Sequence, residues 1–233
     1  MKGGVDMSTQ WKSEYEDQGY FVIEGLFSEE EVVALKAEKD HVLDAVRQEK
    51  GKDAIRHGVY VGMAAASALF RAAAAKPQLA DALKQVIGDQ VVFLSDKVVF
   101  KDASVDFGSP WHQDYPYWKG SHKVSVWIAL DDAVPENGCL RVVPGSHKLG
   151  AVQHGGQTDE NGFSSRLTSD FIDSADIVDV PAKRGTAIVF HDLLFHSSYP
   201  NESGADRVAL ISTYKDGTQP DPEYSWAMAA FAL

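Results

Sequence analysis

The stretch Val91-Val92-Phe93-Leu94-Ser95-Asp96-Lys97-Val98-Val99-Phe100 decides the fold, because β-branched and aromatic residues surround a short polar segment. Further runs of the same kind follow at 124–130, 140–143, 177–180, 186–190 and 208–214. Turn residues such as Glu136-Asn137-Gly138 and Pro144-Gly145-Ser146 separate them. Many short strands without long intervening helices predict an antiparallel sandwich or jelly roll over about residues 90–216.

The preceding part of the chain has helical spacing. Ser28 and Glu31 form a capping-box pattern, and the helix that they begin is expected to run to about Glu49. A second helix is predicted over Ala64–Ala75, and Pro77 is expected to open a third one that ends before Gly88. These helices, over about 8–88, predict a buttress packed on one sheet. Residues 1–233 are therefore expected to form one mainly β domain with flanking helices.

Composition narrows the classes of function. The 233 residues carry a net charge of -12, which argues against nucleic acid and anionic membranes as partners. The single cysteine allows no internal disulfide, and the first residues contain no apolar signal segment. The protein is expected to be cytoplasmic and to form a monomer or a homodimer. The segment 145–176 has no clear pattern and is predicted to be a lid, a binding loop or a mobile segment.

The motif Trp111-His112-Gln113-Asp114 suggests a metal site. On an extended strand, side chains two positions apart point to the same face, so His112 and Asp114 can reach one ion. A second histidine would complete the two-histidine, one-carboxylate set of non-haem iron oxygenases. His191 and His196 are both candidates, and their spacing alone does not choose between them.

Several ordered blocks resemble the phytanoyl-CoA dioxygenase family. They are Trp111-His112-Gln113-Asp114, the strand from Val126 to Asp132, Asn137-Gly138-Cys139-Leu140, Val143-Pro144-Gly145-Ser146-His147, and the run from Phe190 through His196-Ser197-Ser198 and Asn201 to Arg207. The resemblance covers about Asp96 to Tyr214. It implies a double-stranded β-helix, a cupin-like jelly roll, and an Fe(II)- and 2-oxoglutarate-dependent oxygenase.

The resemblance also assigns roles. It implies that His112, Asp114 and His196 bind Fe(II) and are the catalytic residues, and that Arg207 binds the distal carboxylate of 2-oxoglutarate. An arginine fork can form two parallel charge-assisted hydrogen bonds with a carboxylate, which lysine cannot reproduce. His191 is then expected to be a core or supporting histidine.

The resemblance also suggests further residues that contact the co-substrate or the substrate. Ser198 and Trp127 resemble residues that contact the co-substrate in some relatives, so both are candidates for 2-oxoglutarate binding. Trp118 reproduces the His-x-Asp-x-x-x-Trp spacing of ectoine hydroxylases and is a candidate for substrate binding, as are Tyr115 and His147. For the aromatic residues the alternative is a place in the core, and for His147 it is stabilisation of its turn.

Lys97 and Lys101 lie on the strand that leads to the motif, where one of them is a candidate to bind an acid, but surface exposure is the expected state of both. The aromatic residues around the motif, in an acidic chain, favour a cationic or zwitterionic substrate held by cation–π contacts.

The implied reaction consumes O2 and 2-oxoglutarate, releases succinate and CO2, and hydroxylates a small molecule. The carboxylate of Asp114 favours hydroxylation over halogenation, because related halogenases lack it. Two alternatives have the same kind of fold: a non-catalytic sensor of 2-oxoglutarate or metal, and a cupin-like zinc or manganese enzyme. Oxygen consumption separates the sensor from an oxygenase, and metal analysis separates the zinc or manganese enzyme.

Overall fold

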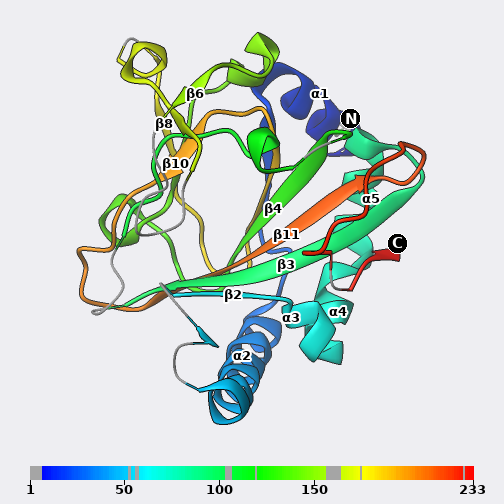
Figure 1. Ribbon diagram of the computed structural model, residues 1–233, viewed down its shortest axis with the longest axis vertical. Helices are drawn as coiled ribbons and strands as arrows, with labels where there is room; N and C mark the ends of the chain where they lie inside the picture. Colours follow the sequence, from blue (N-terminus) through cyan, green and yellow to red (C-terminus); the bar gives the residue numbers. More distant parts are fainter. Residues whose placement is uncertain are drawn as a thin grey trace, which may run out of the picture.

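The computed structural model describes residues 7–51, 54–55, 58–102, 107–118, 120–155, 164–173, 175–227 and 229–233. In these parts a seven-stranded sheet forms the centre of the molecule (Figure 1). Along the sheet the strands are β1 (Tyr20–Ile23), β9 (Ala187–His191), β4 (Lys123–Ala129), β11 (Arg207–Asp216) and β3 (Val91–Lys101), with β12 (Phe231–Ala232) and β2 (Val59–Val61) both paired to β3.

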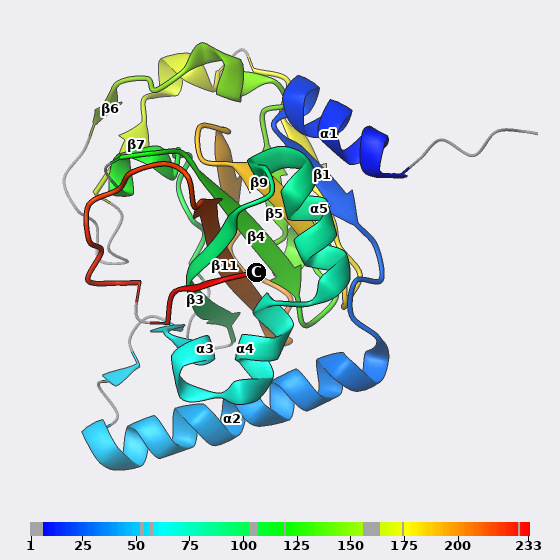
Figure 2. The same cartoon turned by 90° about the vertical axis from the view of Figure 1, so that its right-hand side faces the viewer.

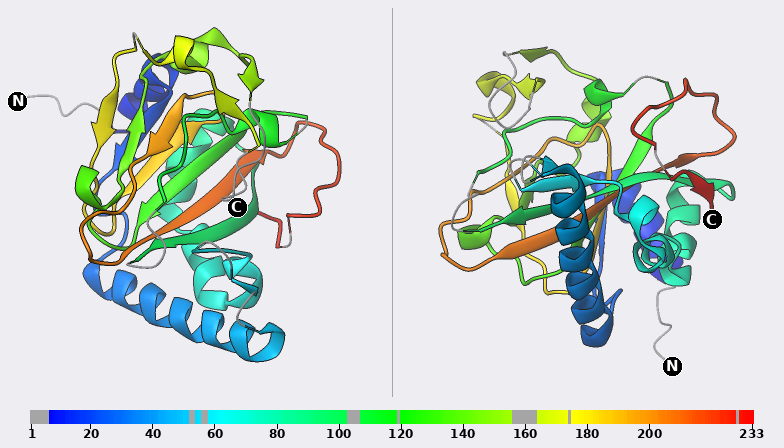
Figure 3. Two further views of the ribbon diagram at one scale, coloured as in Figure 1. Left: turned by 60° about the vertical axis from the view of Figure 1, so that its left-hand side comes forward. Right: turned by 60° about the horizontal axis from the view of Figure 1, so that its bottom comes forward.

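A smaller sheet lies opposite the large one (Figures 1 and 3). It contains β10 (His196–Ser198), β5 (Leu140–Val142) and β8 (Val178–Val180), and a separate pair is formed by β6 (His154–Gly155) and β7 (Arg166–Leu167). All of these pairings are antiparallel. Apolar side chains from both sheets form a common core, which includes Trp127, Ile188 and Ala209 from the large sheet and Leu140 and Val142 from the small one. Two antiparallel sheets around one core confirm the predicted jelly roll.

Helices cover the other face of the large sheet (Figure 2). They are α1 (Met7–Gln18), α2 (Glu29–Lys50), α3 (Met63–Ala66), α4 (Ala68–Ala74) and α5 (Pro77–Ile87). Short 3-10 turns lie in the connections: η2 (Tyr115–Tyr117), η3 (Pro135–Asn137), η4 (Ser146–Leu149) and η5 (Ser169–Phe171). Helix residues such as Leu35, Phe70 and Leu83 pack with Val126 and Leu210 of the sheet. None of the helices described is long and apolar enough to span a membrane.

The side chains of the large sheet alternate between two hydrophobic cores, one under the helices and one between the two sheets. In β4, Val126 and Ile128 face the helices, whereas Trp127 and Ala129 face the small sheet. Because successive strand residues point to opposite faces, each sheet residue contributes to one core only. The buttress of helices therefore stabilises the sheet from outside and leaves the face between the sheets for the site.

The helices agree with the sequence prediction in part. The capping box of Ser28 and Glu31 is present, and α2 ends at Lys50 before Gly51. The predicted helix over Ala64–Ala75 is instead two helices, because Ser67 has an extended backbone and its hydroxyl accepts a hydrogen bond from the N–H of Leu69.

The strands also differ from the prediction at polar positions. The polar residues Ser95-Asp96-Lys97 do not interrupt β3, since the buried Asp96 carboxylate accepts the N–H of Ala64 at the start of α3. Residues 196–198, which were not among the runs predicted to be strands, form the strand β10. Within the segment 145–176, the described residues contain η4, β6, β7 and η5, and residues 156–163 and 174 lie outside the described part.

Candidate active site

Two histidines face each other across a short antiparallel bridge. The N–H of His112 donates to the carbonyl of His196 at 3.0 Å, and the N–H of His196 donates to the carbonyl of His112 at 3.1 Å. Each imidazole also uses its Nδ1: that of His112 lies 2.7 Å from the carbonyl of Pro110, and that of His196 lies 2.9 Å from the carbonyl of Leu194. Since a carbonyl can only accept, Nδ1 carries a proton in each ring, and in the neutral imidazole Nε2 then keeps its lone pair.

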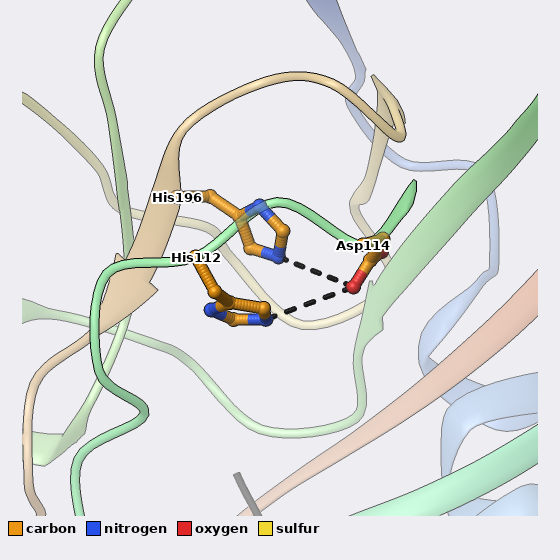
Figure 4. Close-up of side chains that lie close together, drawn as sticks. All are labelled: His112, Asp114 and His196. Atoms are coloured by element: carbon orange, nitrogen blue, oxygen red, sulfur yellow. Dashed lines mark ion pairs between the residues drawn. The ribbon is translucent and has the colours of Figure 1, made fainter. Parts of the chain in front are cut away.

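Asp114 completes the group (Figure 4). Its Oδ1 lies 3.6 Å from Nε2 of His112 and 3.7 Å from Nε2 of His196. Its Oδ2 accepts a hydrogen bond of 2.7 Å from the hydroxyl of Ser125 on β4, which fixes the carboxylate plane and leaves Oδ1 toward the histidines. The three ligand atoms lie within 4.8 Å of one another.

This donor set fits a divalent transition metal. Two ligand atoms that are each about 2.1 Å from one ion can be at most about 4.2 Å apart, and both distances from Oδ1 of Asp114 fall within that limit. Burial and the neighbouring imidazole of His112 lower the pKa of His196 to about 4, so this side chain is neutral near pH 7. Burial opposes ionisation of Asp114, but its interactions with His196 and His112 outweigh burial and lower the pKa of this carboxyl. Two neutral imidazoles and one carboxylate form the facial set that suits non-haem iron.

Gln113, between the two ligands, points away from them. Its amide nitrogen donates to the carbonyls of Gly150 and Leu193, and its oxygen accepts the N–H of Val152. This fully buried side chain thereby ties the loop after η4 to the segment before β10. Gln113 anchors the motif on one side and the backbone bridge between His112 and His196 anchors it on the other, so His112 and Asp114 stay aligned with His196.

His112, Asp114 and His196, which we call the metal group because they could hold an ion, open into a cavity of about 420 Å³ between the two sheets, within the usual size range of small-molecule sites. Arg207, the first residue of β11, lies in its wall and is almost fully buried. Its Nε donates to the carbonyl of Asn137 at 3.4 Å, but its Nη1 is buried without a hydrogen-bond partner among the described residues. An unsatisfied buried guanidinium nitrogen is costly, so this atom is suited to a carboxylate that enters the cavity.

Lys101 is a second buried cation in the same cavity. Its Nζ donates to the hydroxyl of Ser198 at 3.0 Å and to the carbonyl of Tyr199 at 2.5 Å. Burial and the positive charge of Arg207 lower the pKa of Lys101 to about 7. The expected surface exposure of Lys101 was therefore wrong.

The signal that could have indicated burial of Lys101 is a glycine in one of the family-like blocks. Gly138 has a φ of +96°, and a Cβ on it would lie 2.9 Å from Nζ of Lys101. A Cβ would also lie 2.7 Å from the backbone oxygen of Tyr199, so this backbone contact and the positive φ favour glycine at the position next to the lysine.

The structure brings most of the predicted site residues to this cavity. Trp118, Trp127 and Ser198 line it, and the guanidinium of Arg207 lies over the ring of Trp127 at 5.6 Å. Tyr115 and His147 do not line it. Tyr115 lies in η2, where its ring packs against His122, and His147 is held against α1 by a contact between its Nε2 and the carbonyl of Glu16.

The fold and the site define an oxygenase-like jelly roll in which a candidate metal-binding group shares one cavity with a buried arginine. The family model for phytanoyl-CoA dioxygenase matches residues 15–209. The chain belongs to the phytanoyl-CoA dioxygenase family.

Three characterised proteins illustrate the similarity. An L-proline trans-4-hydroxylase of Streptomyces griseoviridis is 29% identical over 71% of this chain and 69% of its own length. An ectoine dioxygenase of Bordetella bronchiseptica is 25% identical over 97% of this chain and 84% of its own length. The solved structure of the epimerase SnoN, in complex with Fe3+, alpha ketoglutarate and nogalamycin RO, superposes with a TM-score of 0.76 at 22% identity, over 93% of this chain and 86% of that one. The chain is a dioxygenase that depends on Fe(II), 2-oxoglutarate and O2.

Proposed function

We propose that His112, Asp114 and His196 bind the catalytic Fe(II), and that Arg207 binds the distal carboxylate of 2-oxoglutarate. In this proposal the enzyme hydroxylates a small-molecule metabolite and acts in the cytoplasm, as a monomer or homodimer. The described helices and sheet would form one oxygenase domain. The names of the relatives, which act on proline and ectoine, support a small metabolite as the substrate.

One observation carries the proposal: a cluster of metal-ligand atoms and a buried cation face the same cavity. Ligand atoms of His112, Asp114 and His196 lie within 4.8 Å of one another, and Nη1 of Arg207 is buried without a hydrogen-bond partner among the described residues in the same wall. Buried polar atoms normally have partners. A metal ion and a dianionic keto acid together would satisfy both sets, whereas a metal alone would leave the arginine unpaired.

The residues around Arg207 would complete the co-substrate pocket. Lys101 and Ser198 supply a cation and a hydroxyl beside the guanidinium, and Trp127 supplies a flat apolar wall. A carboxylate placed between two cations and a hydroxyl gains charge-assisted hydrogen bonds in a site that excludes water. When bound, iron and 2-oxoglutarate supply the oxidising chemistry, with succinate and CO2 as products. The protein contributes binding, orientation and the exclusion of water.

The test is co-substrate binding under anaerobic conditions, followed by turnover. Protein loaded with Fe(II) is expected to bind 2-oxoglutarate, and the Arg207→Met variant is expected to lose this binding while it keeps iron. With O2 and a substrate, wild type should form succinate and Asp114→Ala should not. Failure of iron-loaded wild type to bind 2-oxoglutarate would contradict the proposal, as would unchanged binding in Arg207→Met. Binding without O2 consumption for any substrate would indicate a sensor instead.

A further inference from the structure

A third cation, Lys97, lines the cavity away from Arg207 and Lys101. On β3 the residues Lys97, Val99 and Lys101 all face the cavity, because they alternate along the strand. Four strand residues span about 13 Å, so the two lysines lie at different ends of this face. Lys97 pairs with Ile211 of β11, and Trp127 of β4 follows Ile211 in the same row of the sheet.

Lys97 differs from the other two cations in its surroundings. Arg207 and Lys101 are almost fully buried, whereas the side chain of Lys97 is exposed. Among the described residues Lys97 has no ion pair and no side-chain hydrogen bond, although most lysines on the described surface are paired with an acid. Its charge nevertheless reaches the metal group, because it is one of the charges that lower the pKa of Asp114. The amine is thus open to a ligand near the site of oxidation.

The charge balance of the cavity also favours an anion. Its described lining contains three cationic side chains and a single acidic one, Asp114. The charges of Fe(II) and of the 2-oxoglutarate dianion cancel, so loading the site does not remove the positive excess. The excess remains even when Lys101, with its pKa lowered to about 7, is neutral. A local positive potential in a chain with a net charge of -12 is a feature of this cavity and not of the whole protein.

Much of the remaining lining of the cavity is apolar. Ile211, which pairs with Lys97, and Val59 lie in the cavity wall, and Tyr117 and Trp118 contribute rings from η2 and the residue after it. Such a wall can bind an aliphatic or cyclic carbon skeleton and leaves Lys97 as the polar contact.

We propose that Lys97 binds an anionic group of the primary substrate, and that the substrate class is small organic acids with an apolar body. This inference rests on the proposed function, because it takes the Arg207 end of the cavity to be occupied by 2-oxoglutarate. The sequence favoured a cationic or zwitterionic substrate, and the present inference adds an anionic group, which a zwitterion also carries. Lys97 is a substrate-binding residue that determines specificity, and its flexible point charge accepts carboxylates in more than one orientation.

The experiment measures binding of matched acids and amides to protein loaded anaerobically with Fe(II) and saturated with 2-oxoglutarate. Isothermal titration calorimetry would compare cyclohexanecarboxylate with cyclohexanecarboxamide, and pentanoate with pentanamide. Saturation with 2-oxoglutarate keeps the acids away from Arg207. Wild type is expected to bind each acid about tenfold more tightly than its amide, the range of one charge-assisted hydrogen bond.

Variants assign the effect to Lys97. Lys97→Met should abolish the preference for acids, and Lys97→Arg should keep it, with 2-oxoglutarate affinity changed by less than about twofold in both. Lys148→Met, a surface lysine of η4 paired with Asp17, is the matched control and should behave as wild type. Equal affinities for acid and amide, undetectable binding of the acids, or a preference that survives in Lys97→Met would overturn the inference while 2-oxoglutarate binding is normal. Loss of 2-oxoglutarate binding by wild type would overturn the proposed function as well.

Discussion

The described residues contain two groups of two histidines and one aspartate, and their difference shows what makes a metal site. The first is His112, Asp114 and His196; the second, which we call the supporting group, is His122, His191 and Asp192. In both groups the ligand atoms lie within 4.8 Å of one another. Composition and proximity therefore do not distinguish them.

Hydrogen bonding does distinguish them. In the supporting group, Oδ2 of Asp192 accepts the indole N–H of Trp118 and the backbone N–H of Lys123, and its Oδ1 lies 2.9 Å from Nδ1 of His122 and 3.0 Å from Nδ1 of His191. Its carboxylate is already satisfied by protein. In the first group the corresponding oxygen, Oδ1 of Asp114, lies 3.6 Å from Nε2 of His112 and 3.7 Å from Nε2 of His196, and the three residues line the cavity. A metal site needs free lone pairs, whereas the supporting group uses its lone pairs to hold η2 and β4 together.

The largest predicted difference is in turnover. Asp114→Asn removes the anionic ligand of the proposed metal site, so substrate-dependent succinate formation is expected to fall by about a thousandfold or more, which corresponds to about 4 kcal/mol of barrier. Asp192→Asn should retain turnover within about tenfold, since its oxygens only position the loop. Assays at saturating Fe(II) and 2-oxoglutarate would measure both. Equal losses in the two variants would show that the groups are not functionally distinct.

For the free energy of unfolding, Asp192→Asn should have a larger effect than Asp114→Asn, the reverse of their order for turnover. Asp192 is fully buried and accepts several hydrogen bonds, so Asp192→Asn is expected to lower the free energy of unfolding of the metal-free protein by about 2 kcal/mol. Asp114→Asn should lower it by less, because Ser125 can still donate to the amide oxygen and Oδ1 of Asp114 lies 3.6 and 3.7 Å from Nε2 of the two histidines. Urea unfolding with metal chelated would compare them. A larger loss in Asp114→Asn would contradict this account.

Lys101, in the wall of the cavity, should make the binding of 2-oxoglutarate depend on pH. Lys101, with its pKa lowered to about 7, must take up a proton when a carboxylate binds beside it. The dissociation constant of 2-oxoglutarate should therefore rise by about tenfold from pH 7 to pH 8.5. Lys101→Met should bind more weakly and lose most of this slope, whereas Lys97→Met should keep it. A wild-type affinity that does not change over this range would exclude the titration of Lys101.

The smallest predicted effect concerns His122. The hydrogen bond with Asp192 raises the pKa of His122, so the pair stabilises the fold fully below the ordinary value and the stabilisation is lost as the pH rises through the raised value. Because the side chain of His122 is 57% exposed, His122→Gln should cost less than about 1 kcal/mol at pH 5.5 and nothing at pH 9. Unfolding curves at the two pH values would test this, and a cost that grows with pH would contradict it.

The sequence was sufficient for the features that depend on local patterns. The capping box at Ser28, the helix that begins at Pro77 and the strand around Trp127 follow from local spacing, and the structure contains all three. The jelly roll and the family also followed from ordered blocks of residues. His196 could be preferred over His191 only through the family resemblance, since both follow apolar residues.

Features that depend on tertiary contacts could not be read from the sequence. The burial of Lys101 requires Gly138 and Ser198, which are distant in sequence but adjacent in the fold. His147 lies against α1 because residues near 145 contact the end of that helix, through the N–H of Gly145 and the carbonyl of Gln18. Lys97 and Lys101 have the same residue type and nearly the same sequence context, but they lie at different depths in one cavity.

Iron stoichiometry measured by anaerobic equilibrium dialysis tests the central claim most directly. Wild type is expected to bind one Fe(II) per chain, Asp114→Asn to bind little or none, and the double variant His122→Gln/His191→Gln to bind one, as wild type does. Two Fe(II) ions per wild-type chain with one lost in the double variant, or full binding by Asp114→Asn, would contradict the assignment of the metal to His112, Asp114 and His196.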